Sequence, residues 1–355
     1  MSIVFHPRTR RRRRAAATVL FLLMPPAFNA ANAQSSKAMH VTFSEYSPLA
    51  NASEIARRTL SPLVALEVTR RGAHSGKTLI EQTVRLTDED FVVYIPAHRP
   101  PRGYALLVFV PPWQDARLPS GWAPILERYD TIFVSAARSG NEVGVMDRRE
   151  PLALLAAANV LRQFPVDADA VFIGGFSGGA RVAQRLALAY PDLFRGAILN
   201  AGSDPIGSQD MPLPPKDLFY RFQEYSRLVY VTGEIDARLA TDQDSMRSMH
   251  QWCVFAVQGH VEPSTGHEVL GSTALAWALS AVLHDVPAVS HKLPGCRASI
   301  DQDLDTQLNA AEQQLTGGAP GSGEQLLRKI DARYGGLAAP RSVELANRYA
   351  QILAP

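Results

Sequence analysis

Apolar runs alternate with amphipathic stretches through the middle of the chain. Residues 105–110 and 131–135 are almost entirely apolar, as strands of a parallel sheet are when helices cover both faces. Residues 152–164 have the apolar spacing of a helix and end before Pro165. The same patterns predict further strands at 170–173, 196–199, 228–231 and 253–257, and further helices at 178–190, 242–250 and 272–283. Repeated strand–helix units of this kind predict an α/β fold with a doubly wound, mostly parallel sheet.

The pattern is weaker on the N-terminal side of this region. Residues 44–66 have the character of an irregular or helical lead-in. Residues 79–85, followed by 91–95, predict a hairpin-like pair of strands.

The first residues have the three parts of an export signal. Arg10–Arg14 form a basic region, residues 15–24 an apolar region and Ala31–Ala33 a small-x-small cleavage site, which predicts a signal peptide over 1–33. A membrane anchor is the alternative, but it needs about 20 apolar residues, and Pro25-Pro26 ends this run early. No cysteine near the cleavage site could carry a lipid. We expect a periplasmic or secreted protein without stable membrane insertion after cleavage, exported by either the Sec or the twin-arginine route.

The C-terminal part differs in character from the middle. From about Arg297 the pattern becomes polar and helical, with helices predicted at 304–315 and 324–334 and a flexible glycine-rich break at 317–323. Two interpretations stay open: this part packs against the main domain, or it docks an unknown protein partner. The chain is thus divided into a signal peptide (1–33), an N-terminal lead-in (34–78), a main α/β domain (79–290) and a C-terminal helical extension (291–355).

Composition agrees with a globular, enzyme-sized domain, since 46% of the 355 residues are hydrophobic and 20% are charged. The basic balance of the whole chain comes from the signal peptide, which has six arginines and no acid. The remainder has 30 Lys and Arg against 34 Asp and Glu, a net charge of −4. Nucleic acids and anionic lipids require clustered Lys and Arg. Neither is therefore expected as a partner.

Two cysteines, Cys253 and Cys296, belong to the exported part of the chain. An oxidising compartment permits a disulfide between them. The alternative is two buried thiols, since Cys253 lies in an apolar, strand-like run. Neither cysteine has the surroundings of a metal ligand or of a nucleophile.

Ser177 stands in the most informative motif of the chain, Gly-Phe-Ser-Gly-Gly. The motif follows a predicted strand and precedes a predicted helix, which is the context of a nucleophilic serine on a sharp turn. Such a turn brings the backbones at the positions two before and two after the serine close together, and both Gly175 and Gly179 are glycines. An ordinary glycine-rich turn or a phosphate-binding loop is the alternative. The strand-to-helix context favours the nucleophile.

A serine hydroxyl needs a general base, and the base needs an acid to orient it. When the nucleophile follows a strand in this way, the acid and then the histidine follow later in the chain. Asp236, in the turn after the strand at 228–231, is the predicted acid, and Glu234 and Asp242 are its rivals. A strand-end aspartate that only caps a helix or forms a turn is the structural alternative.

Two histidines, His260 and His267, follow the last predicted strand. His267 is the predicted base because it lies late in the loop, directly before the helix that starts near Ser272. His260 lies close to the strand end, where capping or packing is the more ordinary role.

The fourth requirement is a pair of amides for the oxyanion. Gly178, directly after the nucleophile, is expected to give one N–H. The loop after the strand at 105–110 should give the second, but Pro111-Pro112 have no N–H, so Trp113 or Gln114 must supply it, and Trp113 is our assignment. The two prolines either fix this loop in a preorganised form or mark a remodelled, inactive site.

Two tryptophans and two arginines near the motifs could have a further role in substrate binding, but none is assigned to the site for it. Trp113 and Trp122 could line an acyl or aromatic pocket, although tryptophan is more often a core or rim residue. Arg138 and Arg181 could meet an acidic substrate, although solvated or ion-paired arginines are the ordinary case.

Residues 105–284 resemble the α/β-hydrolase superfamily, in particular bacterial secreted esterases similar to polyhydroxyalkanoate depolymerases and feruloyl esterases. The resemblance rests on Gly-x-Ser-x-Gly before a helix, a strand that ends in Thr-Gly-x-x-Asp, and Gly-His before the last helix, here Ser177, Asp236 and His267. It implies hydrolysis of a small-molecule or polymeric ester through an acyl-enzyme, without cofactor or metal. The Pro111-Pro112 loop departs from the usual pattern, and no polymer-binding module is evident.

Two other functions stay open on the same residues. The first is a serine peptidase or an acyltransferase, which would use the same three side chains. The second is a non-catalytic periplasmic binding or scaffold protein that keeps the fold, for which the proline loop and the C-terminal helices would be the supporting features.

Overall fold

The structure is a computed structural model that describes residues 37–74, 79–284, 289–317 and 319–352. The predicted signal peptide lies outside the described residues. Across the described ranges, no helix combines the length and apolarity that crossing a bilayer requires.

An eight-stranded sheet forms the centre of the part that the structure describes, with the strand order β1-β2-β4-β3-β5-β6-β7-β8. The pairs β1–β2 and β2–β4 are antiparallel and all other pairs are parallel. The strands are β1 Met39–Val41, β2 Phe91–Tyr94, β3 Tyr104–Val110, β4 Thr131–Ala136, β5 Val166–Phe176, β6 Gly196–Asn200, β7 Arg227–Gly233 and β8 Val257–Glu262. The sheet is mostly parallel, so the predicted doubly wound α/β fold class is confirmed.

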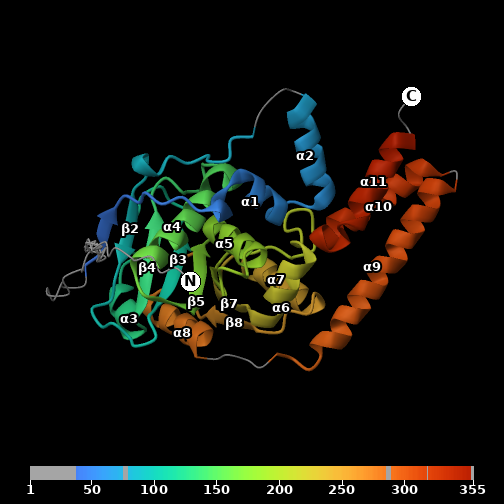
Figure 1. Ribbon diagram of the computed structural model, residues 1–355. Coiled ribbons are helices and arrows are strands. Elements are labelled where there is room, and N and C mark those ends of the chain that lie inside the picture. The colour runs from blue at the N-terminus through green and yellow to red at the C-terminus, as the bar shows by residue number, and fades with distance from the viewer. Residues whose placement is uncertain (1–36, 75–78, 285–288, 318, 353–355) are drawn as a thin grey trace, which may run out of the picture. The chain divides into compact units, whose positions relative to one another are not determined.

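Helices cover both faces of the sheet (Figure 1). Along β3, Leu106 and Val108 belong to one buried cluster, with α4 and α5, and Leu107 and Phe109 to a second, with α3 and α8. This alternation is why the strand is apolar at every position. The helices of this part are α1 Ala52–Thr59, α2 Pro62–His74, α3 Ala123–Arg128, α4 Glu150–Gln163, α5 Gly178–Ala189, α6 Lys216–Tyr225, α7 Leu239–Gln251 and α8 Ser272–Leu283, with single turns η1 Pro48–Ala50, η2 Leu86–Asp88 and η3 Val145–Arg149.

The predicted hairpin of 79–85 with 91–95 is wrong in its first strand. Residues 79–85 are irregular, with Leu79 and Ile80 exposed, and β2 pairs instead with the short strand β1. The exposed pair Leu79 and Ile80 thus gave residues 79–85 the apolar pattern of a strand. The three residues of β1 are too few for a strand pattern to be recognised.

The predicted strand at 253–257 is also wrong, since β8 begins only at Val257. Cys253 has a φ of 63°, which no strand residue adopts, and its N–H donates to the carbonyl of His250 in the turn that ends α7. Trp252 to Val254 are buried, so the apolar run reflects burial of a turn.

The C-terminal extension is helical, as predicted, but its boundaries differ. It consists of α9 Leu293–Thr316, α10 Pro320–Tyr334, the turn η4 Gly335–Ala338 and α11 Arg341–Ile352, of which α11 was not predicted. The glycine-rich break is shorter than 317–323, because Pro320 starts α10 and a proline is well tolerated in a first helical turn.

Covalent and polar contacts join this extension to the rest of the described chain. A disulfide links Cys253 to Cys296 in α9, which settles the open question of the two cysteines. The carboxylate of Asp331 in α10 accepts hydrogen bonds from the Ser61 hydroxyl and the Leu63 amide. Burial of this aspartate raises the pKa of its carboxyl group. In the structure, the C-terminal extension therefore packs against the main domain, which is the first of the two interpretations given above.

Candidate active site

Ser177 lies in a strained turn between β5 and α5. Its φ of 55° and ψ of −123° are in a region that residues with a side chain rarely adopt. The Ser177 amide donates to the carbonyl of Asn200 at the end of β6, which ties the turn to the neighbouring strand. A Cβ on Gly179 would overlap the Val110 carbonyl, and one on Gly175 would overlap the backbone of Gly179. Both predicted glycine positions are thus set by close backbone approach.

Gly179→Ala and Gly178→Ala are expected to differ in stability. The new methyl group at 179 meets backbone, which has to move, and we expect a loss of about 1–3 kcal/mol in the free energy of unfolding. A methyl group at 178 meets only the carboxamide of Asn141, which can rotate, so the cost should stay below about 1 kcal/mol. Urea unfolding of both variants measures the difference. Equal losses would contradict the close approach at Gly179.

His267 lies in the loop between β8 and α8 and contacts both other members of the predicted constellation. Its Nε2 is 2.9 Å from Oγ of Ser177, and its Nδ1 is 2.9 Å from Oδ2 of Asp236. The imidazole is 43% exposed, whereas the Asp236 carboxylate is fully buried. The three residues that the sequence predicted, from three separate loops, therefore form one continuous line of hydrogen-bonding groups.

The rival histidine has a different environment. His260 belongs to β8, where its Nε2 is 2.7 Å from Oε1 of Glu262 and its ring lies 4.8 Å from the ring of Trp277. These contacts account for His260 as a packed and hydrogen-bonded residue.

The rival acids are also bound elsewhere. Glu234 accepts the amide N–H of Ser264, at the surface. Asp242 is buried and accepts hydrogen bonds from the hydroxyls of Ser203 and Thr232. Burial raises the pKa of the Asp242 carboxyl group. Asp236 is the acid that meets the imidazole, and its Oδ1 also accepts the amide N–H of Arg238 at 2.8 Å.

The loop that bears His267 is held by residues that sequence reasoning missed. The side-chain oxygen of Asn200 accepts the Leu270 amide at 3.0 Å, and Nε1 of Trp122 donates to the Leu270 carbonyl at 2.8 Å. The ring of Phe176 lies 4.8 Å from the imidazole. Asn200 ends a predicted strand next to the nucleophile strand, which was the available signal. Trp122 is a buried core residue, not the wall of a pocket.

The loop of the two prolines is fixed through its carbonyl groups. The Pro111 carbonyl accepts from the guanidinium of Arg149 at 3.0 Å, and the Pro112 carbonyl accepts from the amide of Asn141 at 3.1 Å. Within the described ranges, the amides of Trp113 and Gly178 make no hydrogen bond to another residue. Both predicted oxyanion donors are therefore without an acceptor among the described residues.

Asn141 and Arg149 are two further residues near the site that sequence reasoning missed. The carboxamide of Asn141 lies against Gly178, and Arg149 is only 3% exposed although it is charged. Arg138 and Arg181 have the ordinary role of ion-paired residues, with Glu89 and Asp204 respectively.

A cavity of about 640 Å³ opens beside Ser177. It lies among the first turns of α5, the turn η3 and the loop that follows β6, and Gly178 and Asn141 are part of its wall. Trp113 packs instead between the rings of Phe109 and Phe176, at 6.1 Å and 6.4 Å. The space next to the nucleophile is therefore shaped mainly by elements other than the tryptophans.

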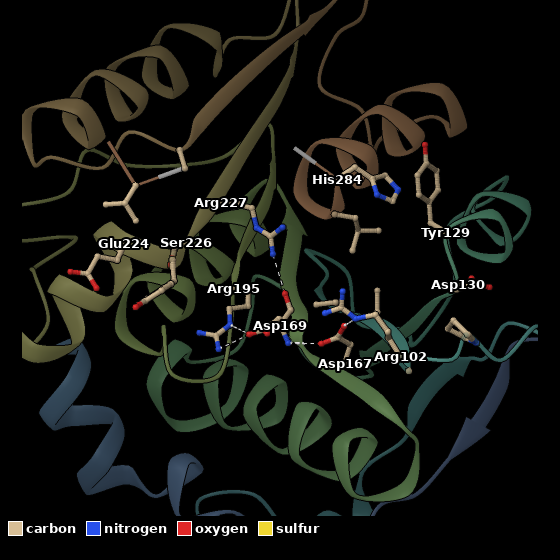
Figure 2. A pocket seen from close by; sticks show the side chains of 18 of the residues that line it. Arg102, Tyr129, Asp130, Asp167, Asp169, Arg195, Glu224, Ser226, Arg227 and His284 are labelled. Atoms are coloured by element: carbon tan, nitrogen blue, oxygen red, sulfur yellow. Dashed lines mark hydrogen bonds and ion pairs between the residues drawn. The ribbon is translucent and has the colours of Figure 1, made fainter. Parts of the chain in front are cut away.

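A second cavity, of about 990 Å³, lies at the opposite edge of the sheet, near the first residues of β3 and β7. Figure 2 shows that its charged side chains are directed at one another: Arg195 forms an ion pair with Asp169, and Arg227 donates to the Asp169 carbonyl. The larger space thus has no side chain of the Ser177 constellation, and we place the candidate active site in the smaller one.

The three comparisons with known proteins bear on the fold alone. No protein-family model and no curated protein matches the sequence. An S-formylglutathione hydrolase from Staphylococcus aureus is 13% identical, with 55% of this chain and 92% of that chain aligned and a TM-score of 0.43. A ferulic acid esterase is 14% identical over 55% and 91% of the two chains, with a TM-score of 0.41. A poly(3-hydroxybutyrate) depolymerase from Bordetella parapertussis is 17% identical over 59% and 88%, also with a TM-score of 0.41.

Proposed function

We propose that this protein is an exported serine hydrolase that cleaves carboxylic esters through an acyl-enzyme on Ser177. The observation that carries the proposal is the continuous contact from Ser177 through His267 to a buried Asp236. A buried carboxylate next to an imidazole favours acyl transfer, because it stabilises the imidazolium that forms when the serine loses its proton. The two unpaired amides of Gly178 and Trp113 support the same reaction.

The first half of the reaction acylates the serine. Nε2 of His267 accepts the hydroxyl proton of Ser177 while Oγ attacks the ester carbonyl. The tetrahedral oxyanion takes hydrogen bonds from the amides of Gly178 and Trp113. The imidazolium then gives its proton to the departing alkoxide, which leaves as an alcohol.

The second half removes the acyl group. A water molecule loses a proton to His267 and attacks the acyl-enzyme carbonyl, and the imidazolium returns that proton to Oγ of Ser177 as the carboxylic acid leaves. Asp236 keeps the proton of the neutral imidazole on Nδ1, so that Nε2 faces the serine or the attacking water as an acceptor at the start of each half-reaction.

Covalent labelling tests the proposal directly. A fluorophosphonate should modify one residue of the native protein, and trypsin places Ser177 in the peptide 163–181, where it is the only hydroxyl-bearing residue. Mass spectrometry should therefore find the label on that peptide, and protein unfolded before labelling should remain unmodified. Absence of the label, or its presence on another peptide, would contradict the proposal. Turnover of p-nitrophenyl esters but not of peptide anilides would distinguish an esterase from a peptidase.

Export to the periplasm or the exterior is part of the same proposal. It rests on the predicted signal peptide and is supported by the Cys253–Cys296 disulfide, since stable disulfides belong mainly to oxidising compartments. N-terminal sequencing of the protein from the producing cell should begin close to Gln34.

A further inference from the structure

The cavity beside Ser177 is lined by an unusual number of arginines. Four of its wall residues are Arg149, Arg181, Arg185 and Arg238, and two are the acids Asp204 and Asp210. The described chain otherwise has acids and bases in near balance, so a local excess of positive charge next to the nucleophile requires a reason.

Two of these arginines are neutralised by acids. Arg181 forms an ion pair with Asp204 at 2.5 Å, and Arg185 forms one with the buried Glu150 at 2.8 Å. These two residues are accounted for as structural ion pairs.

Arg149 is not neutralised in this way. Its side chain donates to the carbonyls of Ser139 and Pro111, and no carboxylate of the described residues lies within ion-pair distance. Burial lowers the pKa of Arg149 to about 10, which still leaves the guanidinium protonated at neutral pH. Glu142 and Glu150 act on it electrostatically without forming an ion pair. A buried cation without an ion-paired carboxylate favours an anionic ligand in the adjoining space.

Arg238 is the second uncompensated cation. Its backbone N–H binds Asp236, but its exposed guanidinium has no carboxylate partner within the described ranges. It enters the wall of the cavity from the start of α7, and Arg149 enters from η3. The two cations thus approach one cavity from two separate elements.

Apolar side chains complete the wall. Leu60, Val145, Met146, Val182 and Met211 line the same cavity. A volume of about 640 Å³ with apolar walls and two cations that lack an ion-paired carboxylate is suited to a carbon chain that ends in an anion.

We propose that the substrate of this site is an ester that bears a carboxylate, which Arg238 and Arg149 recognise beside Ser177. The proposal rests on the proposed ester hydrolysis and specifies its substrate class. The carboxylate lies on the part of the ester that occupies this cavity, and its charge-assisted hydrogen bonds to a guanidinium raise kcat/KM about 10-fold over a neutral ester of the same size.

Two matched pairs of esters test this preference. p-Nitrophenyl hemisuccinate against p-nitrophenyl butyrate places the charge on the acyl part, and 4-carboxyphenyl acetate against phenyl acetate places it on the alcohol part. The wild-type protein should prefer the charged member of one pair about 10-fold, and Arg238→Glu should abolish or reverse that preference. Arg247→Glu, also on α7 but paired with Asp244 outside the cavity, is the matched control.

Binding measurements separate this inference from the proposed reaction. Monomethyl succinate should bind to the Ser177→Ala variant more tightly than methyl butyrate, as measured by calorimetry, and Arg238→Glu in that background should remove the difference. Equal binding of the two compounds, or a preference that survives Arg238→Glu, would overturn the inference even if esters are hydrolysed. Preferential binding without turnover of any ester would retain the inference as a carboxylate site and overturn the proposed hydrolysis.

Discussion

Ser177→Ala is expected to lower kcat for ester hydrolysis by about 10⁶-fold, and His267→Ala by a similar factor. The hydroxyl and the imidazole are 2.9 Å apart, and neither can act without the other: the serine is not a nucleophile unless its proton is removed, and the imidazole has no second proton to remove. The double variant should therefore have the same kcat as either single variant, because the second substitution removes a group that no longer contributes to catalysis.

The measurement is kcat on p-nitrophenyl butyrate for the wild type, both single variants and the double variant. The three variants should retain about 10³-fold acceleration over water, because the amides of Gly178 and Trp113 and the binding cavity remain. Matching far-UV circular dichroism spectra and melting temperatures are the control for folding. If the two losses multiply in the double variant, the residues act independently and the assignment of a common mechanism is wrong.

Much of the fold could be predicted because buried parallel strands appear in the sequence as continuous apolar runs. The runs at 105–110 and 131–135 are almost entirely apolar, since each has helices on both sides, and the structure places β3 and β4 there. The edge of the sheet gave no such signal. β1 has three residues with little burial, so its pairing with β2 depends on the rest of the sheet already being in place.

Errors at 253–257 and at 79–85 have the same physical origin. Apolar residues indicate burial or local clustering but not backbone conformation, and Cys253 is buried in a turn with a positive φ. The helix α11 was not predicted, although Pro340 directly precedes its first residue and a proline there is a helix-start signal.

Sequence alone predicted the site residues whose side-chain chemistry and position after a strand can be recognised one residue at a time. Ser177, Asp236 and His267 each follow a strand, and the carboxyl ends of parallel strands meet at one edge of the sheet. Residues that act through a contact with a part of the chain distant in sequence have no recognisable sequence pattern. Arg149 holds the Pro111 carbonyl across the loop, and an arginine at the start of a helix gives no sign of this on its own.

Asp236→Asn is expected to lower kcat by about 10⁴-fold although the new side chain has the same shape. Oδ1 of Asp236 accepts the amide N–H of Arg238 at 2.8 Å, so the asparagine must place its oxygen there. Its NH₂ group then takes the place of Oδ2, which lies 2.9 Å from Nδ1 of His267, and donates to that nitrogen. The imidazole is forced to carry its proton on Nε2, where it faces Ser177 and cannot accept the hydroxyl proton.

Asp242→Asn is the matched control. It should change kcat less than about fivefold, since one altered hydrogen bond changes the activation free energy by at most about 1 kcal/mol. Asp242 lies six residues away and is equally buried, but its partners are the hydroxyls of Ser203 and Thr232, which can rotate to accept a hydrogen bond from the new amide. Steady-state kinetics on p-nitrophenyl butyrate gives both factors. Equal losses in the two variants would mean that removal of a buried negative charge, rather than the wrong tautomer of His267, limits the reaction, and the role assigned to Asp236 would then be wrong.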